Sequence, residues 1–394
     1  MSYSSFKFFT VSLLFLFLFS CNSKKITQPP KSSTELCVGK YYTEEQGAKK
    51  LEELSENYHT AAEWEKRADK IRKQIRNGAE LDLIPKKNWQ YPIVVAHGAK
   101  HHLDGYTVEN IALELSPGYV VHGNLYKPVS IQGKAPAVLN PHGHWFEKDD
   151  YGRFRPDMQY RCAVFAKMGA IAFAWDMYGT GEDTAHRHHS PEALTMQTFN
   201  TIRILDYISS LSDVDTSRIA ITGASGGGTQ TFIASAIDNR LDVSAPVVMV
   251  SAHFFGGCVC ESGKPIHKHG NFETNNVEIA ACFAPKPLLL VSDGNDWTKN
   301  VPDVEYPYIR NIYKLFDAEN NVEFAHFKDE VHNYGPSKRQ AVYRFFIKHL
   351  NLDPGSLLNE DGKIDESFVK ILDTDELKVF PERDLVPDPM KDYP

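Results

Sequence analysis

The sequence predicts an α/β fold, a mostly parallel central sheet with helices on both faces and a helical appendage at the N-terminal side. Three observations predict it. Short apolar segments alternate with helical segments over residues 137–350, which is typical of a parallel sheet covered by helices. A glycine-rich turn at Gly223–Gly227 joins one apolar segment directly to a helical one. Two β-rich segments around Ser116-Pro117-Gly118 form a hairpin before the alternation, which adds a mixed edge.

The first 40 residues indicate export rather than folded structure. The apolar run Phe8–Ser20 has roughly a dozen residues, whereas a bilayer span needs about 20, so residues 1–20 are predicted to be a signal peptide. Leu18-Phe19-Ser20-Cys21 resembles the lipobox of bacterial lipoproteins. We therefore expect a lipid on Cys21, a polar tether over 21–40, and attachment to a bacterial membrane at an outer-membrane, periplasmic or surface face. A plain cleaved signal or an uncleaved anchor is the alternative.

Residues 41–90 are expected to be a helical segment. Apolar residues recur at three- and four-residue spacing, and Asn77-Gly78 gives a stop signal. The recurring positions are Leu51, Leu54, Tyr58, Ala61, Trp64, Ala68 and Ile71. This pattern predicts a pair of helices that pack on a larger domain. A helix that docks a partner is the alternative.

Residues 91–350 are expected to form that larger domain. The expected strands are Tyr91–Ala96, Tyr106–Leu115, Tyr119–Tyr126, Ala137–Asn140, Ala170–Trp175, Arg218–Thr222, Ala245–Val250, Pro287–Val291 and Val322–Phe327. The expected helices are Gln159–Met168, Pro191–Ser210, Gly227–Ile237, Asp303–Phe316 and Gln340–Leu350. Residues 351–394 follow as an acidic, proline-containing C-terminal tail.

Charge and composition exclude two classes of protein. The 394 residues include 43 Lys plus Arg and 51 Asp plus Glu, so the net charge is −8. Nucleic-acid binders usually carry a basic face, so no nucleic-acid partner is expected. With 42% hydrophobic residues the chain is also too apolar to be disordered.

The stretch Gly223-Ala-Ser225-Gly-Gly227 matches the G-x-S-x-G pattern of a nucleophile elbow. An expected strand lies directly before it and an expected helix directly after it, which is the context that the motif requires. Small neighbours allow the sharp turn that exposes a serine hydroxyl above a sheet edge. No Lys-Ser/Thr pair follows the glycines, so a phosphate-binding P-loop is excluded. Ser225 is predicted to be a nucleophile.

A serine nucleophile needs a histidine base, and the base needs an orienting acid. In this class of site the chain order is serine, acid, histidine. His332 follows the last expected strand and precedes the closing helix, so it is the predicted base. Asp296, in the loop after the strand that ends near Val291, is the predicted acid. The alternatives for the acid are Asp293, Asp329 and Glu261.

The substrate oxygen that becomes negative needs two N–H donors. One is expected from Gly226, directly after the nucleophile. The other is expected from the loop Pro141-His142-Gly143-His144-Trp145 after the Ala137–Asn140 strand, at Gly143 or His144.

Over about Tyr106–Leu350 the sequence resembles secreted bacterial α/β-hydrolases grouped with acetylxylan esterases. The resemblance lies in Pro117–Pro128, Asp176-Met-Tyr-Gly179, Gly223–Gly228, Asp296-Trp297 and His332-Asn-Tyr334. It implies an α/β-hydrolase fold and a serine carbohydrate esterase with Ser225, Asp296 and His332 as its triad. The expected substrate is an acetylated polysaccharide or oligosaccharide.

Other functions stay open beside this one. The same fold could serve a peptidase, a lipase or a glucuronoyl esterase, or a non-catalytic glycan-binding lipoprotein. In glucuronoyl esterases an arginine follows the nucleophile and can serve the oxyanion, whereas Gly226 stands there in this chain.

Aromatic residues near the expected strand ends suggest a sugar-binding surface, and Trp145, Tyr178 and Trp297 are the predicted substrate contacts. Two segments, Ala185–Ser190 and Phe254–Thr274, look like insertions that cover the site, and we call them the roof segments. The second contains Cys258-Val-Cys260 and His267-Lys-His269, a set that could bind zinc. For an exported protein we instead expect these cysteines to form a disulfide, with Cys282 as a further candidate partner, or to lie buried. No metal and no cofactor are expected.

Overall fold

The computed structural model describes residues 37–39, 41–84, 92–147 and 150–389. The predicted signal peptide, the lipidation site Cys21 and most of the tether lie outside these residues, so these predictions remain predictions. Among the described helices, none is both long enough and apolar enough to cross a bilayer.

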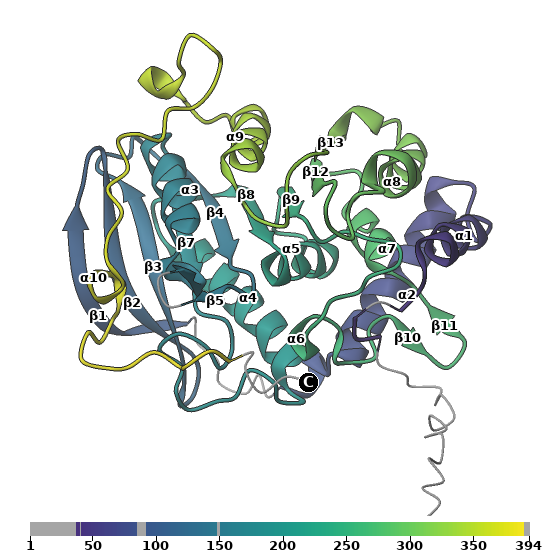
Figure 1. Ribbon diagram of the computed structural model, residues 1–394, viewed down its shortest axis with the longest axis horizontal. Coiled ribbons are helices and arrows are strands. Elements are labelled where there is room, and N and C mark those ends of the chain that lie inside the picture. The colour runs from purple at the N-terminus through teal and green to yellow at the C-terminus, as the bar shows by residue number, and fades with distance from the viewer. Residues whose placement is uncertain (1–36, 40, 85–91, 148–149, 390–394) are drawn as a thin grey trace, which may run out of the picture. The chain divides into compact units, whose positions relative to one another are not determined.

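The core of the protein is a nine-stranded sheet in the order β1-β2-β3-β7-β4-β8-β9-β12-β13 (Figure 1). The first four strands in that order pair antiparallel, and every pair from β7 to β13 is parallel. The strands are β1 (Ile93–His102), β2 (Tyr106–Ser116), β3 (Tyr119–Pro128), β4 (Ala135–Pro141), β7 (Ile171–Trp175), β8 (Val214–Ala224), β9 (Val243–Val247), β12 (Leu288–Asp293) and β13 (Val322–Phe327). The predicted parallel sheet with a mixed edge is confirmed.

Helices cover both faces of the sheet (Figure 1), and a separate hydrophobic core lies between each face and its helices. One core contains side chains of α3 (Pro156–Lys167) and α9 (Pro336–Leu350). The other contains side chains of α4 (Ala193–Ser210), α5 (Gly226–Ile237), α7 (Asn276–Ala281) and α8 (Tyr306–Lys314). The predicted fold class is therefore confirmed.

The two helices expected near the N-terminal side are α1 (Glu44–Ser55) and α2 (Ala61–Gly78). Each begins with a capping box, from Thr43 and Thr60, in which the threonine side chain and the third helical residue satisfy each other's backbone N–H. Trp64 and Ile71 of α2 are fully buried in the same core as α5 and α7. The periodic apolar positions thus face the sheet domain.

Short elements inside the connections were not expected from the sequence. They are β5 (Phe146–Glu147), β6 (Asp150–Tyr151), α6 (Val259–Ser262), β10 (Lys268–His269), β11 (Phe272–Glu273), α10 (Thr374–Leu377), the 3₁₀ turns Leu81–Leu83, Gly152–Phe154, Glu319–Asn321 and Gly355–Leu357, and the π turn Val301–Glu305. Elements of two to five residues carry too little periodicity to be read from sequence. The helix expected over 303–316 begins as the π turn, and α8 starts beside Pro307, which lacks a backbone donor.

The acidic C-terminal segment packs back across the sheet as far as the structure describes it. Side-chain amides of the sheet hold its carbonyl groups, with Asn124 Nδ2 donating to Leu377 O at 2.9 Å and Asn110 Nδ2 donating to Glu376 O at 2.8 Å. Leu377 itself is fully buried. The segment therefore covers one face of the antiparallel strands β1–β3.

A buried arginine joins this C-terminal segment to the sheet. Arg153 is 0% exposed, donates from Nε to Asp176 Oδ1 at 2.8 Å, and pairs through Nη2 with Glu182. Its Nη1 donates to Leu377 O at 2.9 Å. Burial, together with the neighbouring Glu182, raises the pKa of Asp176 to about 7. Among the described residues, Arg153 is the cation that forms ion pairs with both Asp176 and Glu182.

We expect Arg153→Met to destabilise the protein by about 3–5 kcal/mol, because removal of one partner leaves buried carboxylates uncompensated. The loss should grow above about pH 7. Without the arginine the pKa of Asp176 rises further, so the variant keeps losing stability over a pH range where the carboxyl of the wild type is already ionised. Urea unfolding at pH 6 and pH 8.5 measures this. Exposed Arg383→Met is the control and should change stability by no more than about 0.5 kcal/mol. Equal stability of Arg153→Met and wild type would contradict the prediction.

Candidate active site

The loops that hold the predicted nucleophile and oxyanion donors meet at a topological switch point. From β4 the chain passes through α3 to β7 on one side of the sheet order, and from β8 it passes through α5 to β9 on the other side. Loops that diverge in this way leave a crevice at the carboxyl ends of the two strands, which is where ligands bind in open α/β sheets. His142–Trp145 follows β4, and Ser225 follows β8.

Ser225 occupies a strained turn between β8 and α5. Its backbone angles are φ 57° and ψ −123°, a conformation that a residue with a side chain rarely adopts. A Cβ atom on Gly223 would lie 2.4 Å from Pro141 O, and one on Gly227 would lie 2.3 Å from the same oxygen. The turn therefore packs against the end of β4 only because both flanking positions are glycine.

His332 and Asp296 form a hydrogen-bonded pair. His332 Nδ1 lies 2.6 Å from Asp296 Oδ2. The other oxygen of Asp296 accepts from both the backbone N–H and the hydroxyl of Thr298, each at 2.6 Å. The carboxylate is thus fixed from both sides, and it can hold the imidazole with its Nε2 directed away from the acid.

The other carboxylates considered for the acid have different neighbours. Asp293 is fully buried and pairs with Lys338 Nζ at 3.1 Å. Asp329 is exposed. Glu261 Oε1 lies 3.9 Å from His144 Nδ1. The geometry thus favours Asp296 as the acid, whose role remains a prediction.

The imidazole of His332 lies between two tryptophans. Its ring centroid is 5.7 Å from Trp145 and 4.5 Å from Trp297. Among the described residues Ser225 Oγ makes no hydrogen bond, and the side chain is largely covered, with 8% of the residue exposed. Catalytic hydrogen bonds are often open without substrate and tighten when it binds.

The predicted oxyanion donors lie beside the nucleophile. Gly226 is the first residue of α5, where a helix leaves its N–H groups without intrahelical partners. A Cβ atom on Gly226 would lie 2.5 Å from His144 Cε1, so the His144 ring covers this glycine directly. His142 braces the same loop, since its Nε2 accepts from Met177 N–H at 3.1 Å while burial lowers its pKa to about 3.

The three predicted substrate-contacting aromatics do not share one environment. Trp145 and Trp297 are partly exposed and flank His332. Tyr178 is buried, and its backbone carbonyl accepts a hydrogen bond from His188 Nδ1 at 2.7 Å. Only the two tryptophans therefore border the histidine of the site.

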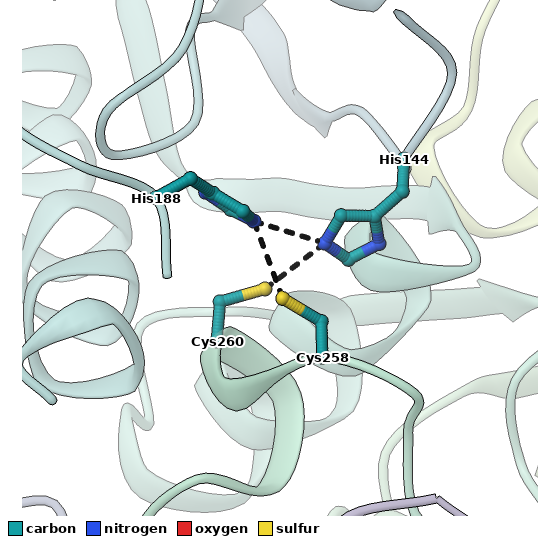
Figure 2. A group of neighbouring side chains, drawn as sticks. All are labelled: His144, His188, Cys258 and Cys260. Atoms are coloured by element: carbon teal, nitrogen blue, oxygen red, sulfur yellow. Dashed lines mark hydrogen bonds between the residues drawn. The ribbon is translucent and has the colours of Figure 1, made fainter. Parts of the chain in front are cut away.

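Both roof segments meet the β4 loop at a cluster of sulfur and nitrogen atoms (Figure 2). The cluster consists of His144 from the β4 loop, His188 from the first roof segment, and Cys258 and Cys260 from the second. The zinc set considered from sequence paired the same cysteines with different histidines. The structure places these elsewhere. His267 stacks on Phe255 with ring centroids 4.5 Å apart, and His269 is exposed.

The cysteines lie buried and unbridged. Cys37, Cys162, Cys258, Cys260 and Cys282 are all buried, and none of them forms a disulfide with another described residue. Of the two arrangements expected for Cys258 and Cys260, the structure thus has the buried one and not the disulfide. Sequence reasoning missed His188 because nothing in its local sequence connects it with cysteines 70 residues away.

Comparison with known proteins places the chain among esterases. Residues 97–256 match the family described as acetyl xylan esterase (AXE1). The chain is 41% identical to the solved methylesterase BT1017, with a TM-score of 0.79, over 86% of this chain and 74% of that one. A putative acetyl xylan esterase from Bacteroides fragilis NCTC 9343 shares the fold, at 17% identity and a TM-score of 0.54 over 69% of this chain and 78% of that one.

Among curated proteins the chain is similar to a 4-O-methyl-glucuronoyl methylesterase of Neurospora crassa. The two are 24% identical over 216 residues, which cover 46% of this chain and 53% of the fungal protein. The chain thus spans about half the length of this curated relative.

Proposed function

The chain belongs to the family of methylesterase BT1017 and matches the acetyl xylan esterase family over residues 97–256, so it is a carboxylic-ester hydrolase. From this we propose that it is a serine esterase acting on an esterified polysaccharide or oligosaccharide. One observation carries the serine mechanism. The strained Ser225 elbow and the His332–Asp296 pair, held at 2.6 Å, stand at the carboxyl ends of the parallel strands.

The proposed reaction proceeds through an acyl-enzyme. Ser225 Oγ attacks the ester carbonyl and gives its proton to His332 Nε2, while Asp296 holds the imidazole in the required tautomer and stabilises its charge. The amides of Gly226 and of Gly143 or His144 bind the oxyanion. His332 passes the proton to the departing alcohol, and water then cleaves the acyl-enzyme by the same steps in reverse.

Two kinds of ester are supported by different observations. The relative at 41% identity is a methylesterase, which favours a methyl ester whose acid belongs to the glycan and whose alcohol is methanol. The family match over 97–256 favours an acetyl ester, in which the glycan is the alcohol. This is the ester that the sequence resemblance implies. We place the methyl ester first, because that relative covers far more of the chain than the family match does.

Product release from a panel of glycans tests the proposal. Methyl-esterified and acetylated glycans are assayed in parallel for methanol and acetate, and peptide and long-chain esters serve as comparison substrates. We expect methanol in excess over acetate and negligible cleavage of the comparison substrates. Release of acetate without methanol would show that the substrate is the acetyl ester and not the methyl ester. Failure of a fluorophosphonate probe to label the protein would sink the serine mechanism and favour a glycan-binding role.

Export and a lipid on Cys21 are part of the proposal and rest on the sequence alone. The mass of the mature N-terminus in a bacterial host tests them, and an unmodified cysteine would contradict the lipid.

A further inference from the structure

We infer that His144, His188, Cys258 and Cys260 form a zinc site that joins the β4 loop to both roof segments. Figure 2 shows the four side chains converging from three separate parts of the chain. One ligand atom from each residue lies within 4.8 Å of the other three. The inference does not depend on the esterase reaction, because metal binding can be measured without any substrate.

The distances between these atoms fit one four-coordinate ion. Zinc–sulfur bonds of about 2.3 Å and zinc–nitrogen bonds of about 2.05 Å in a tetrahedron place nitrogen about 3.6 Å from sulfur and about 3.3 Å from nitrogen. In the structure His144 Nε2 lies 3.0 Å from Cys260 Sγ, His188 Nε2 lies 3.4 Å from Cys258 Sγ, and the two Nε2 atoms are 3.1 Å apart. A small inward or outward shift of each side chain accommodates the ion.

The tautomer of His188 directs a lone pair into the cluster. Its Nδ1 lies 2.7 Å from the carbonyl oxygen of Tyr178, which can only accept, so Nδ1 carries the proton. In the neutral ring Nε2 is then unprotonated, and Nε2 is the atom that faces His144 and Cys258. A backbone carbonyl that holds the distal nitrogen is the usual support of a zinc-bound histidine.

The donor set and its burial select the metal and the kind of site. Two thiolates with two imidazoles in a tetrahedral arrangement are typical of zinc. Cys258 and Cys260 are each 1% exposed, His188 is 2% exposed, and the His144 side chain is 10% exposed. Four protein ligands complete a tetrahedral coordination sphere, which leaves no open position for water. We therefore assign a structural role and no part in the chemical step.

A zinc ion at this cluster would hold part of the candidate active site in position. His144 covers Gly226, the residue after the nucleophile, and belongs to the loop that carries the second predicted oxyanion donor. Its Nε2 faces the thiols. A bound ion would fix the ring, and with it the loop, against two roof segments that are otherwise far apart in the sequence. His144 would thus be a positioning residue.

Metal analysis of the full chain tests the inference. After growth with zinc and extensive dialysis, we expect about one zinc per wild-type chain, and at least a tenfold lower content in Cys258→Ser and His188→Asn. Cys282→Ser is the matched control, because Cys282 is also a buried free thiol but lies outside the cluster, and it should retain the zinc. Apo wild type titrated with Co²⁺ should show the absorption of a tetrahedral site with thiolate ligands, and its thermal midpoint should lie several degrees below that of the zinc form.

Other outcomes would overturn the inference. Wild type that binds neither zinc nor Co²⁺ would do so, and so would a mass showing two hydrogens lost in a Cys258–Cys260 disulfide, or stoichiometric copper in place of zinc. If the cysteine variant does not fold, the cobalt titration of wild type and the metal content of His188→Asn decide alone. If wild-type protein with a full zinc content hydrolysed none of the esters, the proposed function would be refuted and the zinc site would stand.

Discussion

Ser225→Ala is expected to lower kcat for ester hydrolysis by about 10⁵-fold or more, with the fold unchanged. The hydroxyl is the proposed nucleophile, and serine hydrolases that lose it keep only the acceleration given by binding and the oxyanion donors. The backbone at residue 225 has φ 57°, which alanine tolerates no worse than serine. The variant should therefore fold and bind zinc as wild type does, so the loss can be assigned to chemistry.

Initial rates of methanol or acetate release, together with fluorophosphonate labelling located by peptide mass, measure the effect. Ser235→Ala is the matched control. Ser235 lies in α5, the helix that follows Ser225, and is similarly buried. Its hydroxyl donates to Thr231 O and contacts no residue of the site. The control should keep both activity and labelling. Turnover by Ser225→Ala above about a hundredth of the wild-type rate would show that another group is the nucleophile.

The parts of the site that were predictable are those that a single local pattern determines. The elbow needs glycine on both sides of Ser225, a strand before it and a helix after it, and all of these lie within a short stretch of sequence. His332 and Asp296 were placed by chain order and by their position after expected strands. The structure brings these two side chains to 2.6 Å. Local spacing is informative here because parallel strands all present their carboxyl ends at one edge.

The zinc cluster could not be predicted, because its members come from three loops. Within the second roof segment the cysteines had His267 and His269 as near neighbours in sequence, and proximity suggested the wrong histidines. The histidines in the cluster, His144 and His188, lie 116 residues from Cys260 and 70 from Cys258. The contacts between loops above a sheet depend on how insertions fold over it. Such contacts leave no periodic pattern in the sequence.

The same reason explains the C-terminal segment and its arginine. Arg153 gives no signal in the sequence, yet it is fully buried and connects residues of the sheet with Leu377. The acidic composition of residues 351–394 indicates a charged segment but does not predict where that segment packs. Its packing depends on amides of Asn110 and Asn124, which lie in strands more than 250 residues earlier.

Asp296→Asn is expected to lower kcat by about 10³–10⁴-fold with little change in KM. Asp296 Oδ2 now accepts from His332 Nδ1–H, which leaves Nε2 free to take the serine proton. The oxygen of an asparagine would stay with Thr298, where Oδ1 accepts two hydrogen bonds. Its NH₂ group would then face His332 as a donor, so Nδ1 would have to accept and Nε2 would carry the proton. The base would be present in the wrong tautomer.

Asp293→Asn is the variant that separates this role from a structural one. Asp293 pairs with Lys338, both are fully buried, and the substitution leaves the lysine charge partly uncompensated. We expect it to lower the free energy of unfolding by about 3 kcal/mol while kcat per folded molecule stays within a few-fold of wild type. Steady-state kinetics and urea unfolding give kcat and the free energy of unfolding for each of the two variants. If Asp293→Asn lost turnover and Asp296→Asn kept it, the acid would be Asp293. The 2.6 Å contact between Asp296 and His332 would then be a packing contact, because an imidazole that keeps its activity without a carboxylate partner does not need one to set its tautomer.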